Sequence, residues 1–142
     1  MKKIIFICKG NQFRSQIAKA LYNKYKKDDS LAESYGITVE EENNSGRKIA
    51  TFSSLGTIIK SLKMKEGIDY SQEVCKQFTP EIINSADKVI FMDIDQVPKE
   101  YNNKDYVYWR VKDFKNDGST TQKMIEDKID EIKKLVLELI NQ

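Results

Sequence analysis

The 142-residue sequence has no histidine, only two cysteines, and no long apolar run. Without histidine, a catalytic Cys-His or Ser-His pair is impossible, so a nucleophile here would need another source of activation. Two cysteines without histidine also exclude the usual zinc ligand sets, and we expect no bound metal. A disulfide between Cys8 and Cys75 stays open, but two cysteines do not make a disulfide scaffold.

The sequence also lacks a charge of one dominant sign. Its 24 basic and 22 acidic residues give no reason to expect nucleic acid or a membrane surface as a partner. The apolar run near the N-terminus, IIFIC, is shorter than a secretory signal needs and is followed directly by Lys9. No stretch approaches the length of a membrane span. We therefore expect a cytoplasmic protein.

What is present is an alternation of strand and helix patterns. Strands are predicted at 3–8, 31–39, 87–93 and 105–111, and helices at 15–27, 48–65, 80–86 and 120–140. Ser15 and Thr79 are the expected N-caps of the first and third helices. The alternation predicts βαβ units and a parallel sheet. We expect residues 1–142 to form one doubly wound α/β domain in three layers, with a mainly parallel four-stranded sheet and helices on both faces. The apolar face of the last helix is better explained as core than as an interface, so a monomer is expected.

The segment Cys8–Ser15 (CKGNQFRS) joins the first predicted strand to the first predicted helix. In doubly wound folds, ligands bind beyond the carboxyl ends of the strands, and the N-terminus of a helix favours an anion. Gly10 and Asn11 allow a tight loop whose N–H groups turn inward, and Arg14 offers a fork of donors for phosphate oxygens. The same positive field favours a cysteine thiolate, which would attack phosphorus in line. Ser15 could donate its hydroxyl to the sulfur and make it a better leaving group.

This pattern resembles the low-molecular-weight protein tyrosine phosphatase family, which has Cys, five residues, Arg, then Ser or Thr. The resemblance extends to SYGI at 34–37, GIDYSQEVCKQFTPE at 67–81, SADKVIFMD at 85–93 and YWRVKDFKNDG at 108–118. It implies a hydrolase of the protein tyrosine phosphatase type that needs no cofactor. Its partners would be a phosphorylated protein or small phosphomonoester, with inorganic phosphate or a similar oxyanion in the loop.

The resemblance also implies roles for individual residues. Cys8 would form a thiophosphate intermediate, and Asp113 would protonate the leaving oxygen and then activate water, with Asp117 as the fallback acid. Arg14 would bind the phosphoryl group and stabilise the transition state. Ser34, together with Asn11 and Ser15, would hold the loop in shape. The phosphate would lie within the loop, whose residues are Lys9, Gly10, Asn11, Gln12, Phe13, Arg14 and Ser15.

The sequence departs from the family pattern at several positions. Phe13 stands where the family often has a second cysteine, so a local disulfide with the nucleophile is excluded. Phe114 replaces the proline of the family's Asp-Pro pair, which predicts a freer loop around Asp113. Gln16 replaces a common proline, and a histidine often found near Gln72 or Glu73 is absent, which predicts a weaker network around Asn11.

Three alternatives to a phosphotyrosine phosphatase remain open. An arsenate reductase of this fold would need an external thiol, because the strand around VIFMD has no cysteine and Cys75 is expected to be a packed small side chain. The polar Lys9 and Gln12 near the mouth of the loop keep phosphoarginine or another small phosphomonoester open as the substrate. The altered Asp113-Phe114 pair keeps open a catalytically weak phosphate-binding protein.

Overall fold

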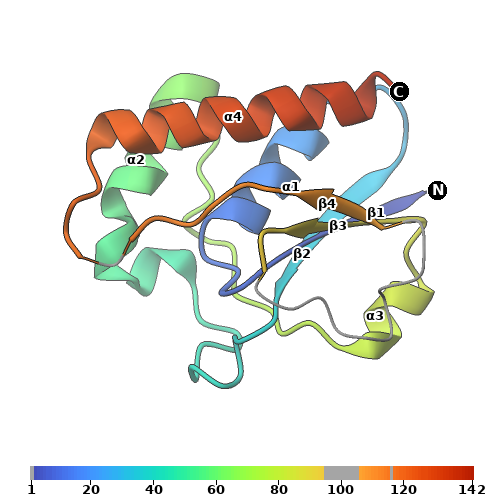
Figure 1. The fold of residues 1–142 in the computed structure, drawn as a ribbon, viewed down its shortest axis with the longest axis horizontal. Coiled ribbons are helices and arrows are strands. Elements are labelled where there is room, and N and C mark those ends of the chain that lie inside the picture. The colour runs from blue at the N-terminus through green and yellow to red at the C-terminus, as the bar shows by residue number, and fades with distance from the viewer. Residues whose placement is uncertain (1, 95–105, 116) are drawn as a thin grey trace.

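The structure is a computed structural model that describes residues 2–94, 106–115 and 117–142. Figure 1 shows the strands and helices that these residues form. In chain order they are β1 (Lys3–Cys8), α1 (Arg14–Tyr25), β2 (Leu31–Gly36), α2 (Gly56–Glu66), α3 (Pro80–Asn84), β3 (Lys88–Met92), β4 (Val107–Trp109) and α4 (Gln122–Ile140). Two short 3-10 turns, Ile49–Thr51 and Ser53–Leu55, precede α2. No helix among the described residues is long and apolar enough to cross a membrane.

The strands form one sheet in the order β2-β1-β3-β4, and every pairing is parallel. This confirms the predicted α/β class and the four-stranded sheet, which is parallel throughout the described pairs. β1 lies between β2 and β3, and all its residues after Lys3 are buried. A continuous apolar strand is expected at such a position, because helices or loops cover both of its faces.

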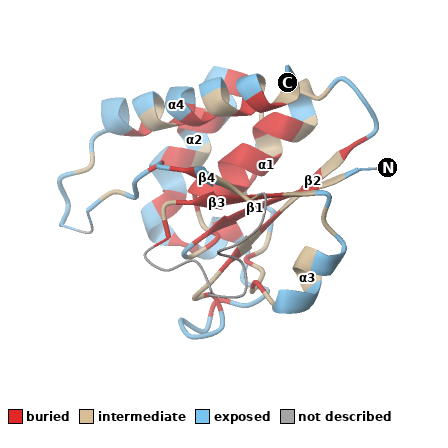
Figure 2. Ribbon diagram, turned by 45° about the vertical axis from the view of Figure 1, so that its right-hand side comes forward, coloured by how far each residue is buried: buried red, intermediate tan, exposed pale blue. Residues whose placement is uncertain are grey.

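The two faces of the sheet have cores of different size. Figure 1 shows α1, α2 and α4 on one side and the short α3 on the other. Alternate residues of β1 divide between the two cores: Ile4, Phe6 and Cys8 join the larger one, and Ile5 and Ile7 the smaller. Figure 2 shows the buried residues concentrated in the sheet and on the inward faces of α1 and α4. Helices on both faces are therefore confirmed.

Two predicted elements differ in extent. β2 ends at Gly36 rather than at Val39, because its partner strand β1 ends opposite it at Cys8. Gly36 is also bridged to a second segment, since its N–H donates to Lys76 O (2.9 Å) and its carbonyl accepts from Phe78 N (2.8 Å). The helix predicted at 48–65 is two 3-10 turns followed by α2, which begins at Gly56. Phe52 interrupts the helix, since its backbone is extended (φ −89°, ψ 111°).

The predicted N-terminal positions of the helices agree with the structure for α3 but not for α1 or α4. α1 begins at Arg14 after Phe13, so Ser15 lies inside the helix and is not its N-cap. Thr79 does occupy the N-cap position of α3, before Pro80, although its side chain makes no capping hydrogen bond. α4 begins at Gln122, two residues later than expected, and the hydroxyl of its N-cap Thr121 accepts from Met124 N at 3.2 Å. The predicted strand at 105–111 appears as Val107–Trp109, and its first residue, Asp105, lies outside the described residues.

Candidate active site

Residues 9–13 connect the carboxyl end of β1 directly to the first turn of α1. Four carbonyl groups around this loop accept hydrogen bonds from outside it. The donors are Ile37 N to Cys8 O (3.1 Å), Thr38 N to Lys9 O (2.9 Å), Gln16 Nε2 to Asn11 O (3.2 Å) and Tyr70 Oη to Gln12 O (3.1 Å). These bonds hold the outer wall of the loop in place.

Fixing the carbonyls also fixes the N–H groups. The described peptide bonds are all trans, so each carbonyl and the N–H of the next residue point in opposite directions. The N–H groups of Lys9, Gly10, Gln12 and Phe13 are thereby turned away from the outer wall. Those of Gly10, Gln12 and Phe13 donate to no described residue. A set of inward N–H groups at a helix N-terminus forms an anion-binding nest.

Asn11 is the central support of the loop. It is fully buried and has a left-handed backbone (φ 55°), which asparagine tolerates better than most residues. Its Nδ2 donates to Ser15 Oγ (2.8 Å) and Ser34 Oγ (3.0 Å). Its Oδ1 accepts from Lys76 N (2.9 Å) and Gln16 Nε2 (3.2 Å). The structure thus brings Asn11, Ser15 and Ser34 together, as the resemblance implied.

The Cys8 sulfur lies at the centre of this network. Its Sγ is 3.0 Å from Ser15 Oγ and accepts from Asn11 N at 3.3 Å. Because Ser15 Oγ already accepts from Asn11 Nδ2, its own proton is free to point at the sulfur. Two donors aimed at one sulfur suit a thiolate better than a thiol.

The guanidinium group of Arg14 makes two kinds of contact, and the Arg14 side chain is 3% exposed. Its Nη1 donates to Met92 O (2.7 Å), Asp93 O (3.3 Å) and Val111 O (2.9 Å), at the ends of β3 and β4. Its Nε and Nη2 donate to no described residue, and Nη2 lies 3.7 Å from Asp113 Oδ2. One edge of the group therefore anchors the scaffold while two donors stay available for an oxyanion.

The two candidate acids differ in surroundings. The Asp113 side chain is 61% exposed and lines the same cleft as Cys8. Asp117 instead accepts hydrogen bonds from the hydroxyl and backbone N–H of Ser119, and these lower the pKa of its carboxyl. Asp117 does not line the cleft. The geometry favours Asp113 over its fallback.

The cleft that contains Cys8 has a volume of about 670 Å³. The loop forms its floor, with Cys8, Gly10 and Arg14 among the lining residues. Its apolar walls are Phe13, Phe114, Leu55, Ile58 and Ile125, and its polar rim includes Lys9, Gln12, Glu42, Asp113 and Lys115. This space can hold an oxyanion on the loop with an organic group above it. Within the described part of the chain, no cluster of three or more possible metal ligands occurs.

The sequence model of the low molecular weight phosphotyrosine protein phosphatase family matches residues 3–139. The chain belongs to this family. An arsenate reductase from Halalkalibacterium halodurans is 31% identical over 127 residues, which cover 86% of this chain and 81% of the relative. The chain is thus similar to proteins named for two different reactions.

Solved structures of similar proteins have the same fold. A low molecular weight protein tyrosine phosphatase from T. tengcongensis has a TM-score of 0.74 at 23% identity, with 99% of each chain covered. An arginine phosphatase from Geobacillus stearothermophilus has a TM-score of 0.75 at 20% identity, covering 99% of this chain and 92% of the other.

Several residues that support the loop were missed by sequence reasoning. Gln16, where the phosphatase family commonly has proline, donates to Asn11 and also to Val74 O (3.0 Å). With Lys76 N, it satisfies Asn11 despite the absent histidine, so the predicted weakening of this network is wrong. Gly36 packs so closely that an added Cβ would lie 2.8 Å from Asn11 N and from Lys9 O. Only the local spacing SYG hinted at this role.

Cys75 is the second thiol near the loop. Neither cysteine forms a disulfide. Cys75 is fully buried in the larger core, and its Sγ lies 3.5 Å from Asn11 O as a donor. Burial raises the pKa of this thiol to about 11, with the neighbouring Cys8 adding to the shift. A neutral, enclosed thiol is a poor nucleophile, which agrees with the expectation of a packed small side chain.

Proposed function

We propose that this protein hydrolyses phosphomonoesters, with protein phosphotyrosine as the first expected substrate, through a cysteinyl-phosphate intermediate on Cys8. The observation that carries the proposal is the convergence of Cys8, the free donors of Arg14 and the carboxyl group of Asp113 on one cleft. The three groups come from the end of β1, the start of α1 and the segment after β4. Such a set supplies a nucleophile, charge stabilisation and proton transfer.

In the first step, the Cys8 sulfur attacks phosphorus, and the bond from phosphorus to the leaving oxygen breaks. The protonated carboxyl group of Asp113 gives its proton to that oxygen. Arg14 Nε and Nη2 and the loop N–H groups stabilise the charge on the three equatorial oxygens.

In the second step, the Asp113 carboxylate takes a proton from water. The water oxygen bonds to phosphorus, and the sulfur–phosphorus bond breaks. Ser15 donates a hydrogen bond to the departing Cys8 sulfur, which lies 3.0 Å away. Phosphate leaves, and Asp113 is again protonated for the next cycle.

The walls of the cleft support an aromatic ester. Phe13, Phe114, Leu55 and Ile58 line the cleft and give it apolar walls that a phenyl ring can contact. Lys9, Gln12 and Glu42 lie on the same lining and offer polar groups to atoms around the phosphorylated residue. In a phosphotyrosine peptide, the ring can contact the apolar walls and the peptide around it can contact the polar groups.

The test is hydrolysis of a chromogenic aryl phosphate, followed by a phosphotyrosine peptide. Cys8→Ser should abolish turnover, while Cys75→Ser should keep most of it. Asp113→Asn should lower kcat by about 10²–10⁴-fold for a poor leaving group. Asp117→Asn, a matched change in the same segment, should leave kcat near that of the wild type. Full activity in Cys8→Ser would exclude the mechanism, and phosphate binding without turnover in the wild type would favour a simple binder.

A second candidate function is arsenate reduction, favoured by the 31% identical arsenate reductase. Cys8 would bond to arsenic and expel water. An external small thiol would then attack the Cys8 sulfur, release arsenite and leave a mixed disulfide. Cys75 is an unsuitable internal thiol, since it is fully buried. This function would be supported instead if arsenite formed only with arsenate, a small thiol and an intact Cys8. The rate of arsenite formation would also have to exceed the phosphatase turnover. Phosphoarginine belongs in the same substrate panel.

A further inference from the structure

Phe13 and Phe114 both line the candidate active site, and their rings stack on each other. Their ring centroids are 5.3 Å apart and their planes differ by 19°. Phe13 is the last loop residue before α1 and is 6% exposed, so its ring is held firmly by the core. Phe114 follows Asp113 directly. The stack therefore ties the residue beside the candidate acid to the phosphate loop.

The segment that carries Asp113 has little regular structure to hold it. β4 ends at Trp109 and α4 begins at Gln122, and the described residues between them form neither helix nor strand. The Asp113 side chain is largely exposed, and an exposed carboxylate on such a segment needs an anchor to stay near Cys8. The Arg14 contact to Val111 O at 2.9 Å anchors the segment before Asp113. The aromatic stack anchors it directly after Asp113.

Two smaller contacts complete the anchor. The Phe114 N–H donates to Asp113 Oδ1 at 2.9 Å, which couples the carboxyl orientation to the backbone of Phe114. On the α4 side, Lys128 Nζ lies 5.9 Å from the centre of the Phe114 ring. The ring is thus placed between the loop and α4, and its position sets the place of the neighbouring carboxyl group.

We infer that Phe13 and Phe114 act as a pair of positioning residues that hold Asp113 at the distance needed for proton transfer to the leaving oxygen. This inference rests on the proposed function. Stacked aromatic pairs are stabilised beyond the area they bury, and a small displacement of a catalytic group lowers rates sharply. The pair explains how Asp113 is held although Phe114 stands in place of a proline.

The test compares two substrates, phenyl phosphate and 2,4-dinitrophenyl phosphate. Only phenoxide, a poor leaving group, needs a proton from Asp113. The comparison uses kcat/KM, which reports the steps up to transfer of the phosphoryl group to Cys8 and excludes the later hydrolysis, where Asp113 acts as a base for both substrates. Phe114→Ala should lower kcat/KM for phenyl phosphate by about 10-fold or more, within the ~10²–10⁴-fold contribution of a general acid. It should lower kcat/KM for dinitrophenyl phosphate by less than about threefold, because that bond breaks without general-acid help. Phe114→Tyr should restore the rate, since it keeps the stack.

Phe13 is tested by Phe13→Leu, which keeps an apolar side chain in the core and removes the ring. It should reproduce the leaving-group dependence of Phe114→Ala. The double variant should lose no more than the larger single loss, because both residues act through one contact. In an Asp113→Asn background, Phe114→Ala should cause no further loss. Circular dichroism would establish that each variant is folded.

Two results would overturn the inference while leaving the proposed function intact. One is an equal loss of kcat/KM for both substrates in Phe114→Ala. The other is a rise of KM with unchanged kcat, which would make Phe114 only a wall for the substrate and not also a positioning residue. A wild-type protein that hydrolyses neither substrate would instead contradict the proposed function itself.

Discussion

Gly36 shows how a single residue without a side chain determines the shape of the loop. It ends β2 beside Cys8, its parallel partner in the sheet. Its N–H donates to Lys76 O and its carbonyl accepts from Phe78 N, and these bonds keep the Gly36 backbone from moving away from the loop. The Asn11 N–H and the Lys9 carbonyl approach the place where a Cβ would stand. The phosphate loop therefore packs against bare backbone.

We predict that Gly36→Ala will disturb the loop. The new methyl carbon would lie 2.8 Å from the backbone atoms Asn11 N and Lys9 O, which cannot move as a flexible side chain would. Overpacking of this kind costs about 1–3 kcal/mol. Urea denaturation should show this loss, and kcat/KM for an aryl phosphate should fall with it.

Gly56→Ala is the matched control for this change. Gly56 is the first residue of α2, has ordinary helical angles (φ −55°, ψ −45°) and has open space around its Cβ position. Alanine should there leave activity unchanged and raise the free energy of unfolding by up to about 1 kcal/mol. Similar effects of both substitutions would contradict the close packing at Gly36.

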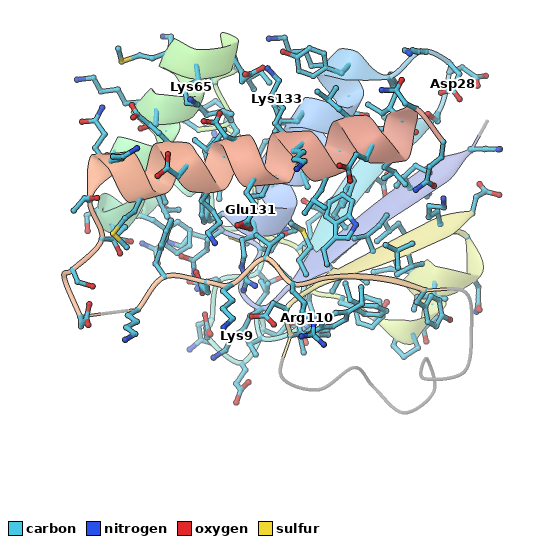
Figure 3. The ribbon with its side chains drawn as sticks, turned by 45° about the horizontal axis from the view of Figure 1, so that its top comes forward. Lys9, Asp28, Lys65, Arg110, Glu131 and Lys133 are labelled. Atoms are coloured by element: carbon cyan, nitrogen blue, oxygen red, sulfur yellow. The ribbon has the colours of Figure 1, made fainter. Side chains whose placement is uncertain are left out.

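Glu66 connects three helices at the scale of whole elements. It is the last residue of α2, and its side chain is 5% exposed. Its carboxylate accepts from Tyr25 Oη of α1 and from Lys133 Nζ of α4 (3.0 Å), with Lys24 Nζ at 3.4 Å. Figure 3 labels Lys133 on α4 and Lys65 on α2. Burial raises the pKa of the carboxyl, but these hydrogen bonds and charges outweigh it, so the pKa is lowered overall.

The lowered pKa predicts an acid-dependent loss of stability. A carboxyl whose pKa is lower in the folded state stabilises the fold above its unfolded pKa of 4.5, and that contribution disappears as the pH falls through the folded value. Glu66→Gln should remove this part of the pH dependence. At pH 7 it should cost about 1–3 kcal/mol, because the buried carboxylate that accepts these hydrogen bonds would lose its charge. Thermal unfolding between pH 7 and pH 3 measures both effects.

Asp130→Asn provides the comparison for Glu66. Asp130 on α4 pairs with Lys65 on α2 at 3.0 Å, but its side chain is 59% exposed. Exposed ion pairs contribute about 0–1 kcal/mol, so this variant should change stability little. If the two variants had equal effects, burial of the Glu66 cluster would not be what matters.

Arg14 joins the site to the fold of the whole molecule. Its Nη1 binds carbonyl groups at the carboxyl ends of β3 and β4, while its remaining donors face the cleft. The residue that would bind phosphate thus also holds the sheet edge together. Stability of the fold and binding of an oxyanion are linked through one side chain.

We predict that Arg14→Lys will lower both the stability of the fold and the affinity for an oxyanion. Lysine has a single donor group and cannot reach Met92 O and Val111 O while facing an oxyanion. The melting temperature without ligand should fall, because each charge-assisted hydrogen bond contributes about 1.5–3 kcal/mol. Inorganic phosphate at 100 times its Kd should stabilise the wild type by about 2.7 kcal/mol, and this gain should be largely lost in the variant.

Arg110→Lys tests the same substitution at an exposed arginine just after β4, which Figure 3 labels. It should preserve both the melting temperature and the phosphate-dependent shift. An Arg14→Lys protein with a normal shift on adding phosphate would show that Arg14 does not bind the anion. Scanning calorimetry with and without phosphate measures all of these values.

The sequence by itself determined the features that depend on neighbours in the chain. The alternation of apolar strands and amphipathic helices predicted the α/β class, and the strand-loop-helix junction at Cys8–Ser15 singled out the candidate site. The sequence was less accurate where long-range contacts override local preference. β2 ends at Gly36 because its partner strand β1 ends opposite it at Cys8, and Ser15 turns inward to Cys8 instead of capping α1.

Only the tertiary structure decided how the site is supported. Gln16, Tyr70 and Lys76 have no local pattern that marks them, because each acts on the loop across a contact that the fold creates. For Gly36, the SYG spacing was only a hint. The stack of Phe13 on Phe114 joins residues about a hundred positions apart. The sequence suggested that Phe114 would free the Asp113 segment, whereas packing against Phe13 anchors it. Local patterns determine elements, but only folding brings distant side chains within contact distance.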